Sequence, residues 1–178
     1  IVHRLAWLAE QGEPPASMLL LTFTRKAAHE RLQRAAATGD QGLIGVQGGT
    51  FHAFAFSVLR RWRPVWLDGR AFSLMDSADI TAALKECKEM LGIAKGDRSF
   101  PKTQAVAGLL SKARNKEQAM DAVLQREACQ LLPHTEALTR LGEAYAAYRR
   151  ERGLLDYDDL LFELEALLQR GGEAAESL

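Results

Sequence analysis

The sequence predicts an α/β fold that begins with part of a parallel sheet and continues into a mostly α-helical inserted subdomain. Two short apolar runs, each followed by a helix-forming segment, indicate the sheet, and strand signals stop near residue 72. The 178 residues are 47% apolar and 26% charged, which is typical of an ordinary globular protein with one domain or one and part of another. We therefore expect an α/β part over 1–72, a helical subdomain over 73–152, and a helix over 153–178 that returns to the first part.

The first strand–helix unit is the clearest. Val2 to Glu10 carries apolar residues on one face and resembles the end of a helix. The continuous apolar run from Met18 to Phe23 predicts a strand buried on both faces. Thr24 stands where an N-cap is expected, and the good helix formers from Arg25 to Ala37 predict a helix.

A second unit repeats this order. Leu43 to Val46 is strand-like, Gly48 and Gly49 predict a turn, Thr50 is a candidate N-cap, and Phe51 to Trp62 predicts a helix. Two such units in series predict parallel strands joined by crossover helices.

Apolar residues at three- and four-residue spacing predict helices throughout the rest of the chain. The predicted segments run from Asp76 or Ser77 to Gly92, from Pro101, around Met120 to Leu124, from Pro133 to Gly153, and from Asp156 onward. In the last helix the expected inward-facing residues are Tyr157, Leu160, Leu161, Leu164, Leu167 and Leu168.

The zero net charge conceals an asymmetry along the chain. Residues 1–70 hold nine basic and five acidic side chains, whereas 151–178 hold two basic and eight acidic ones. Between them, the stretch from Lys95 to Lys116 has six basic residues and one acidic residue, Asp97. This distribution is compatible with a polyanionic partner, but a solvated surface is the more common reason for it.

Several classes of protein are not indicated. No run approaches the roughly 18 apolar residues of a membrane span, and no secretory leader is seen, so we expect a cytoplasmic protein without a membrane partner. Cys87 and Cys129 lack the spacing of a zinc site, and the histidines lack ligand-spaced partners, so no metal site is predicted. No complete catalytic site is visible, and the first residue is not Met, which suggests an excised fragment.

Candidate binding residues gather where the two predicted strands end. Helix N-termini at the carboxyl edge of a parallel sheet present free N–H groups and a positive dipole end, which favour a phosphate. Thr22, Phe23, Thr24, Arg25 and Lys26 add hydroxyls, cations and an aromatic ring there, a combination suited to a phosphodiester with a stackable base. The alternative is that the threonines are caps and the phenylalanines belong to the core.

Two further groups allow both a structural and a functional interpretation. His52, in the first turn of its helix beside Phe51, is a candidate phosphate donor or a structural residue. Asp156, Asp158 and Asp159 are candidates for acid–base or cation chemistry, but acidic residues in a first helical turn more commonly cap the helix and complement its dipole.

Four segments resemble the superfamily 1 helicases of the UvrD/Rep/PcrA type. TFTRKAAHE, from Thr22 to Glu30, closely resembles motif Ia, although Arg25 replaces the usual Asn and Arg31 the usual Met. GTFHAFAFSVLR, from Gly49 to Arg60, resembles the next motif. LLDYDDLL, from Leu154, resembles the approach to the Walker B motif, and IVHRLAWL, from Ile1, resembles the helix after the P-loop.

The resemblance implies a RecA-like, P-loop NTPase type of fold, with 1–72 as part of domain 1A, 73–152 as subdomain 1B and 153–178 returning to 1A. It implies a parent enzyme that uses ATP and Mg²⁺ for 3′-to-5′ movement on single-stranded DNA, at single-strand to duplex junctions and with repair or replication proteins. The chain lacks a G-x-x-x-x-G-K-S/T sequence and the acidic box, so the fragment alone is expected to be inactive. The implied DNA contacts are Thr22, Phe23, Thr24, Arg25, Lys26, Thr50, Phe51, His52 and Tyr157.

Two alternatives stay open. One is a non-enzymatic helical module that binds DNA or protein through the basic stretch Lys95, Arg98, Lys102, Lys112, Arg114 and Lys116. The other is a fragment of a nuclease–helicase of the RecB or AddA kind.

Overall fold

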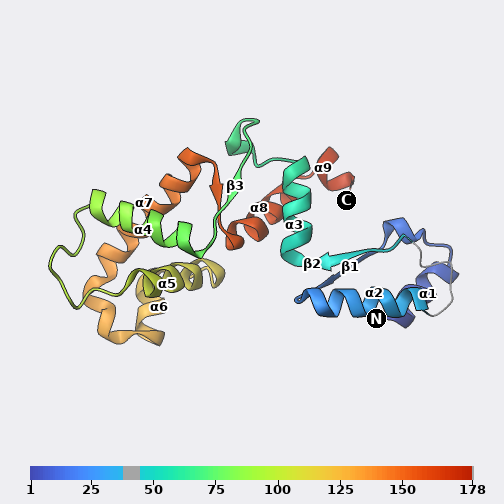
Figure 1. The fold of residues 1–178 in the computed structure, drawn as a ribbon, viewed down its shortest axis with the longest axis horizontal. Coiled ribbons are helices and arrows are strands. Elements are labelled where there is room, and N and C mark those ends of the chain that lie inside the picture. Colours follow the sequence, from blue (N-terminus) through green and yellow to red (C-terminus); the bar gives the residue numbers. More distant parts are fainter. Residues whose placement is uncertain (38–44, 178) are drawn as a thin grey trace. The chain divides into compact units, whose positions relative to one another are not determined.

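The computed structural model describes residues 1–37 and 45–177, which form two compact units. One unit comprises Ile1–Trp62 together with Glu163–Leu178, and the other comprises Arg63–Phe162 (Figure 1). The predicted boundaries at 73 and 152 both lie inside the second unit. In chain order the elements are α1 (Val2–Glu10), η1 (Pro15–Ser17), β1 (Leu19–Thr22), α2 (Arg25–Ala37), β2 (Gln47–Thr50), α3 (Phe51–Arg61), η3 (Val65–Leu67), β3 (Ser73–Leu74), α4 (Ser77–Met90), α5 (Thr103–Asn115), α6 (Met120–Glu127), η4 (Cys129–His134), α7 (Thr135–Arg152), β4 (Leu154–Leu155), α8 (Tyr157–Arg170) and α9 (Glu173–Glu176).

The first unit contains the predicted parallel pair of strands. β1 and β2 pair in parallel, with Leu19 opposite Gln47 at one end and Thr22 opposite Thr50 at the other. The helix α2 runs alongside both strands (Figure 1). Two strand–helix units in series are thereby confirmed, and both helices begin at the edge where the strands end.

The second strand lies later in the chain than predicted. β2 covers Gln47–Thr50, so Gly48 and Gly49 belong to the strand and do not form the expected turn. The turn instead falls at Gly45, whose φ of 111° lies in the region that favours glycine. Leu43 and Ile44 of the predicted strand lie outside the described residues. Glycine is normally a poor strand residue, and here the pairing with β1 decides the conformation.

Apolar side chains hold the first unit together in small clusters. Leu5 of α1 packs with Met18 and Leu20 beside β1, and Val58 of α3 packs with Leu167 of α8. β1 is not buried on both faces, because Leu19 is 41% exposed. On α8, Leu160 and Leu167 are buried as predicted, whereas Tyr157 and Leu168 are exposed, which corrects their expected inward orientation.

The second unit is built mainly from α4, α5, α6 and α7, as the apolar spacing predicts. Asp76 and Asp79 form a reciprocal capping box at the start of α4, and Gly153 ends α7 in the left-handed conformation. The interior is a single apolar cluster with contributions from all four helices. Its most completely buried side chains include Leu84, Cys87, Val106, Val123, Leu124, Leu138 and Leu141.

A short parallel ladder in this unit was not predicted. β3 and β4 pair Ser73 with Leu154 and Leu74 with Leu155, and the Met75 N–H donates to the Leu155 carbonyl at 2.8 Å. Each strand has only two residues, too few for a period-two pattern to be recognised. The ladder joins the two ends of the helical segment, so the chain enters and leaves this segment at adjacent positions.

Candidate nucleic-acid interface

The matched ends of β1 and β2 define the candidate site. Because Thr22 and Thr50 are register partners in a parallel pair, the segments that follow them leave the sheet at one edge. We call residues 22–26 and 50–52 the strand-end edge. It brings together eight of the nine residues predicted to contact DNA.

Both helices at this edge are capped by threonine, as the sequence predicts. The Thr24 hydroxyl oxygen accepts a hydrogen bond from the Ala27 N–H at 3.2 Å, and the Thr50 hydroxyl oxygen accepts one from the Ala53 N–H at 3.2 Å. Neither α2 nor α3 has an acidic residue in its first turn. The positive end of each helix dipole is therefore not offset by a local carboxylate, an arrangement that suits an anion.

Two aromatic rings meet at the strand-end edge. The Phe23 ring centroid lies 5.3 Å from that of Phe51, with the ring planes at 40°. Phe23 is 91% exposed and Phe51 is 37% exposed, so the interpretation of Phe23 as a core residue is wrong. Exposing almost a whole phenylalanine ring to water is unfavourable in the absence of a ligand, since burying such a side chain gains roughly 1.5–3 kcal/mol.

Cationic side chains accompany the rings. Arg25 and Lys26 are exposed in the first turn of α2. The Lys26 ammonium lies 4.0 Å from the Glu30 carboxylate one turn later, a separation typical of a weak surface pair. His52 lies half-buried in the first turn of α3.

Thr22 differs from the other members of the edge. Its side chain is buried, with 5% of the residue exposed, and its hydroxyl donates to the Thr24 carbonyl oxygen at 2.9 Å. A hydroxyl has one proton to donate, and phosphate oxygens only accept. In this conformation the proton of the Thr22 hydroxyl is used within the turn.

Tyr157, the ninth predicted residue, belongs to the other unit. It is the first residue of α8 and is 54% exposed. The acidic residues beside it form a cap: the Asp159 N–H donates to the Asp156 carboxylate and the Asp156 N–H donates to that of Asp159, each at 2.8 Å. This reciprocal pair supports the structural interpretation of the aspartates.

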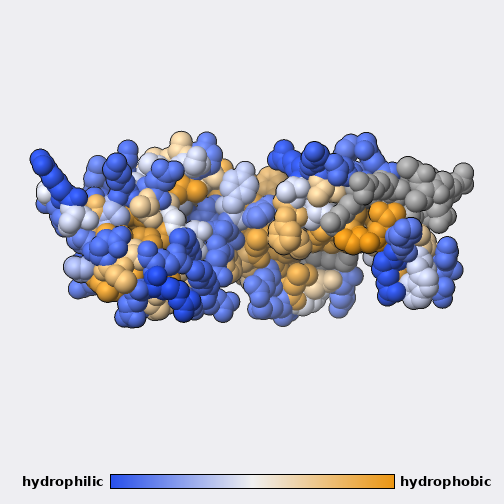
Figure 2. Space-filling view, turned by 90° about the horizontal axis from the view of Figure 1, so that it is seen from below, coloured by the Kyte–Doolittle hydropathy of each residue, from blue (hydrophilic) through white to orange (hydrophobic). Residues whose placement is uncertain are grey.

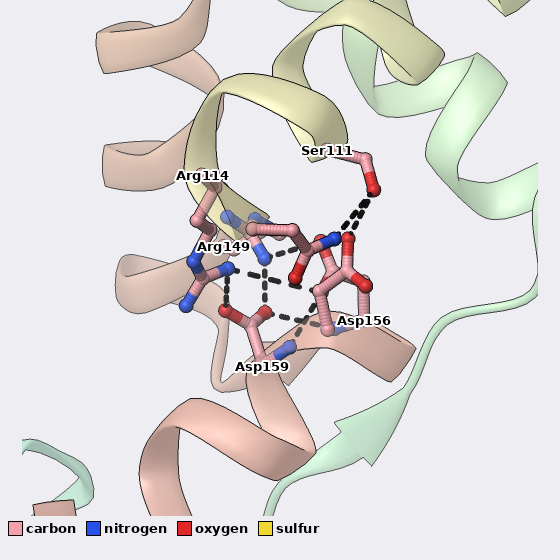
Figure 3. Close-up of polar contacts among 7 residues, drawn as sticks. Ser111, Arg114, Arg149, Asp156 and Asp159 are labelled. Atoms are coloured by element: carbon pink, nitrogen blue, oxygen red, sulfur yellow. Dashed lines mark hydrogen bonds and ion pairs between the residues drawn. The ribbon is translucent and has the colours of Figure 1, made fainter. Parts of the chain in front are cut away.

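Two arginines, of which Arg149 is buried and Arg114 is partly exposed, pair with the aspartates of that cap, as Figure 3 shows. Arg149 of α7 pairs with both Asp156 and Asp159, and Arg114 of α5 pairs with Asp159. Burial raises the pKa of the Asp156 carboxyl, as does the neighbouring charge of Asp159, while Arg149 acts in the opposite direction. We call Arg114, Arg149, Asp156 and Asp159 the arginine–aspartate cluster. Both carboxylates of this cluster, Asp156 and Asp159, are paired with arginine, so neither is free to act as a general acid or base.

The basic stretch of the second unit is partly neutralised. Lys112 and Lys116 both pair with Glu127, and Arg114 is held in the arginine–aspartate cluster. Lys95, Arg98 and Lys102 are exposed, and the described part of the chain shows no ion pair for them. Half of the basic residues in the stretch are therefore engaged in ion pairs.

Sequence inspection did not foresee two features. The contact between Phe23 and Phe51 depends on the register of β1 and β2. The sequence predicted the second strand at Leu43 to Val46, so this register could not be foreseen. Arg149 had no distinguishing signal, because three other basic residues, Arg140, Arg150 and Arg152, lie on the same helix. Asp156 and Asp159 follow Arg149 by 7 and 10 residues, beyond the end of α7, so helical spacing does not indicate the pairing.

Comparison with known proteins identifies the class to which this α/β unit with its capped, aromatic strand-end edge belongs. A family model of the UvrD/REP helicase N-terminal domain matches residues 1–178, so the chain belongs to that family. It is 28% identical to the ATP-dependent DNA helicase PcrA of Bacillus subtilis (strain 168), covering 99% of this chain and 23% of the relative. It is 31% identical to the ATP-dependent DNA helicase Rep of Salmonella typhimurium, covering 99% of this chain and 25% of that protein.

The chain thus spans about a quarter of the length of these relatives. The UvrD/Rep/PcrA resemblance is confirmed, and the parallel strands and mostly helical content are compatible with a RecA-like domain. Within the described residues no helix is long and apolar enough to cross a membrane. In the view of Figure 2, hydrophilic side chains predominate and apolar groups are scattered among them.

Proposed function

We propose that this chain is part of an ATP-dependent DNA helicase, and that its strand-end edge grips single-stranded DNA. The observation that carries the proposal is the exposed Phe23 ring beside Phe51, at the point where two threonine-capped helices begin. The names of the relatives, ATP-dependent DNA helicases, support DNA as the ligand.

The phosphate contacts come from the helix starts. Thr24 and Thr50 use their hydroxyl oxygens as acceptors for the caps, which leaves each hydroxyl proton to donate to a phosphate oxygen. Arg25 and Lys26 add positive charge in the same turn, and His52 adds a ring nitrogen in the first turn of α3. Contacts of this kind position the backbone without reading sequence.

The bases stack on the aromatic pair. Each stacked base contributes roughly 1–3 kcal/mol in single-strand binding proteins, and stacking accepts any base because each has a π-face. We assign Tyr157, in the second unit, a separate stacking contact. At the strand-end edge, the phosphate contacts and the stacking hold the strand with little preference for sequence.

In the whole protein we assign 1–72 to subdomain 1A, 73–152 to subdomain 1B, and 153–178 to a return into 1A. The 178 residues contain no G-x-x-x-x-G-K-S/T sequence, so we assign no step through ATP or Mg²⁺ to this chain. Residues outside it would hold the nucleotide, and movement from 3′ to 5′ along DNA, with a single-strand to duplex junction as substrate, belongs to the whole protein.

The salt dependence of DNA binding tests the phosphate contacts. Removing one cation that contacts a phosphate lowers the magnitude of the slope of log K against log salt by about 0.7 for single strands. We expect this decrease for Lys26→Gln and for Arg25→Gln, measured with an oligothymidylate by fluorescence anisotropy. Lys85→Gln, an exposed substitution on α4, is the matched control and leaves the slope unchanged. Equal slopes for all four proteins contradict these contacts.

A second measurement tests the enzymatic assignment. The full-length protein, purified with the residues that flank this chain, is expected to hydrolyse ATP faster when single-stranded DNA is present. Hydrolysis that does not respond to DNA contradicts the helicase assignment. It would leave the binding role of the strand-end edge to be judged by the salt titration.

The exposed cations Lys95, Arg98 and Lys102 favour a second candidate, a duplex contact by the helical unit. Replacing all three by Gln is expected to weaken binding to a hairpin duplex and to reduce its salt dependence. The triple substitution Lys112→Gln, Arg114→Gln and Lys116→Gln is unsuitable as a control because these residues hold ion pairs. Unchanged duplex affinity in the first triple variant contradicts this candidate.

A further inference from the structure

We propose that Thr22 is a positioning residue, which orders the turn that presents the Phe23 ring without contacting DNA itself. The inference rests on the proposed function, since it concerns how the strand-end edge is prepared for a single strand. It replaces the direct contact that the sequence predicted for this residue.

The hydrogen bond from Thr22 spans the exposed phenylalanine. Its hydroxyl donates to the Thr24 carbonyl oxygen at 2.9 Å, so the residues on either side of Phe23 are tied together. On the strand side, Thr22 is fixed as the register partner of Thr50. On the helix side, the Thr24 carbonyl also accepts from the Ala28 N–H at 3.0 Å, the first bond of α2.

This tie matters because Phe23 has little else to hold it. A side chain that is 91% exposed gains few packing contacts, and the Phe51 ring lies beside it. Its direction is therefore set by the backbone of the turn. Ordering the backbone of a residue costs conformational entropy, and a turn that is ordered before DNA arrives does not incur that cost on binding.

The burial of Thr22 makes the bond difficult to replace by water. The residue is 5% exposed. Thr22→Val keeps the shape and the burial and removes only the hydroxyl. The Thr24 carbonyl still accepts from Ala28, so the substitution leaves no unpaired acceptor at the start of α2. We expect the fold to be preserved and the order of the turn to be lost.

The experiment uses the full-length protein that contains these 178 residues, with two oligonucleotides, an oligothymidylate and a matched strand with abasic sites. Loss of one neutral hydrogen bond predicts about threefold to tenfold weaker binding of the oligothymidylate by Thr22→Val. Thr22→Ser retains the donor and restores binding. Thr81→Val removes an exposed hydroxyl-to-carbonyl bond in α4 and leaves binding unchanged. Affinity for the abasic strand stays the same in every variant.

Three results overturn the inference. In the first, Thr22→Val binds the oligothymidylate as tightly as the natural protein does. In the second, Thr22→Ser fails to restore binding. In the third, Thr22→Val lowers the affinity for both oligonucleotides by the same factor, which indicates a direct phosphate contact. If the natural full-length protein binds neither strand, the proposed function itself fails. Thermal unfolding checks each variant. If Thr22→Val does not fold, Thr22→Cys is compared with Thr22→Ser, because these side chains are similar in size and differ in donor strength.

A spectroscopic readout separates positioning from general stability. 2-Aminopurine placed in the oligonucleotide loses fluorescence when it stacks on an aromatic ring. At saturating protein we expect strong quenching by the natural chain and by Thr22→Ser, and weaker quenching by Thr22→Val. Equal quenching by all three proteins, each fully bound, contradicts a positioning role.

Discussion

The ring of Phe23 lies 5.3 Å from that of Phe51 because the strands that precede them are register partners, Thr22 with Thr50. Two segments distant in the sequence thus form one aromatic surface at the edge of a sheet. The contact depends on the relative placement of two backbones and not on either segment alone. Any change that shifts the register of β2 is expected to separate the rings.

Arg149 is expected to be the most sensitive charged residue of the helical unit. Its side chain is 9% exposed and pairs with Asp156 and Asp159, which are themselves largely buried. Removing one partner of a buried pair leaves an uncompensated charge, at a cost of about 3–5 kcal/mol. We expect Arg149→Met to lower the free energy of unfolding by that amount, measured by urea denaturation with circular dichroism.

The adjacent Arg150 provides the control. It is exposed in the same last turn of α7. Arg150→Met is expected to cost under about 0.5 kcal/mol, as is usual for a surface substitution. Equal losses in the two variants would show that the arginine–aspartate cluster is not what stabilises the start of α8.

Two glycines are expected to respond to alanine in opposite directions. Gly153 ends α7 at a φ of 65°, and a Cβ added there would lie 3.3 Å from the Ala71 carbonyl oxygen. Gly153→Ala should cost roughly 1–2 kcal/mol from the left-handed conformation alone. Gly108 lies within α5 with open space around it, so Gly108→Ala should gain roughly 0.5–1 kcal/mol. Thermal unfolding of both variants measures the difference, and a shift of the same sign in both contradicts the prediction.

The buried hydroxyl of Tyr145 is expected to be dispensable. Among the described residues it has no hydrogen-bond partner, and burial raises the pKa of the phenol. Tyr145→Phe removes an unsatisfied polar atom and keeps the ring under the Arg149 guanidinium, so stability should be unchanged or about 1 kcal/mol higher. Tyr148→Phe is the comparison, because the Tyr148 hydroxyl donates to Glu86 at 2.9 Å. A large loss of stability in Tyr145→Phe contradicts the prediction.

Glu127 should contribute to the decrease in folding stability at acidic pH. Hydrogen bonds from Lys112 and Lys116 lower the pKa of its carboxyl from 4.5 to about 2. A depressed folded pKa gives stabilisation that is present above the unfolded pKa and is lost as the pH falls toward about 2. The titration midpoint of the Glu127 carboxyl ¹³C shift should lie near a pH of about 2 in the natural chain. In the double variant Lys112→Met and Lys116→Met the midpoint should rise toward the ordinary value of 4.5. A midpoint that both proteins share contradicts the assignment.

The sequence was informative where structure is local. Thr24, Thr50 and either Asp76 or Ser77 were predicted as N-caps, and Thr24, Thr50 and Asp76 accept the expected backbone N–H. Gly92 and Gly153 were predicted to end helices, and both adopt positive φ. Such signals succeed because the cap and the turn depend on neighbours within four residues.

Long-range pairing could not be inferred in the same way. The Gly48–Gly49 pair favours a turn by propensity, yet the ladder with β1 draws both residues into a strand. β3 and β4 pair across the whole helical segment, and neither has a side-chain pattern of its own. The burial of Arg149 likewise arises from two carboxylates that a different helix places beside it.

In the candidate site too, the kind of ligand could be predicted from the sequence, whereas the arrangement of the individual side chains could not. The residue types at positions 22–26 and 50–52 indicated a polyanion, and the family resemblance indicated DNA. Their individual roles required coordinates. Thr22 is turned inward and Phe23 outward, although both lie in the same short motif. Because β1 ends in a tight turn, the turn decides which of these side chains points inward and which points outward. The sequence alone does not specify the conformation of that turn.

The most direct test of the account is the affinity of Phe23 variants for an oligothymidylate, since stacking on this ring is its central claim. We predict that Phe23→Ala weakens binding by about fivefold to a hundredfold, the equivalent of one stacked base. Phe23→Trp, which keeps a flat ring at the same exposed position, should bind within a few-fold of the natural chain. Binding by Phe23→Ala that equals that of the natural chain would contradict the account.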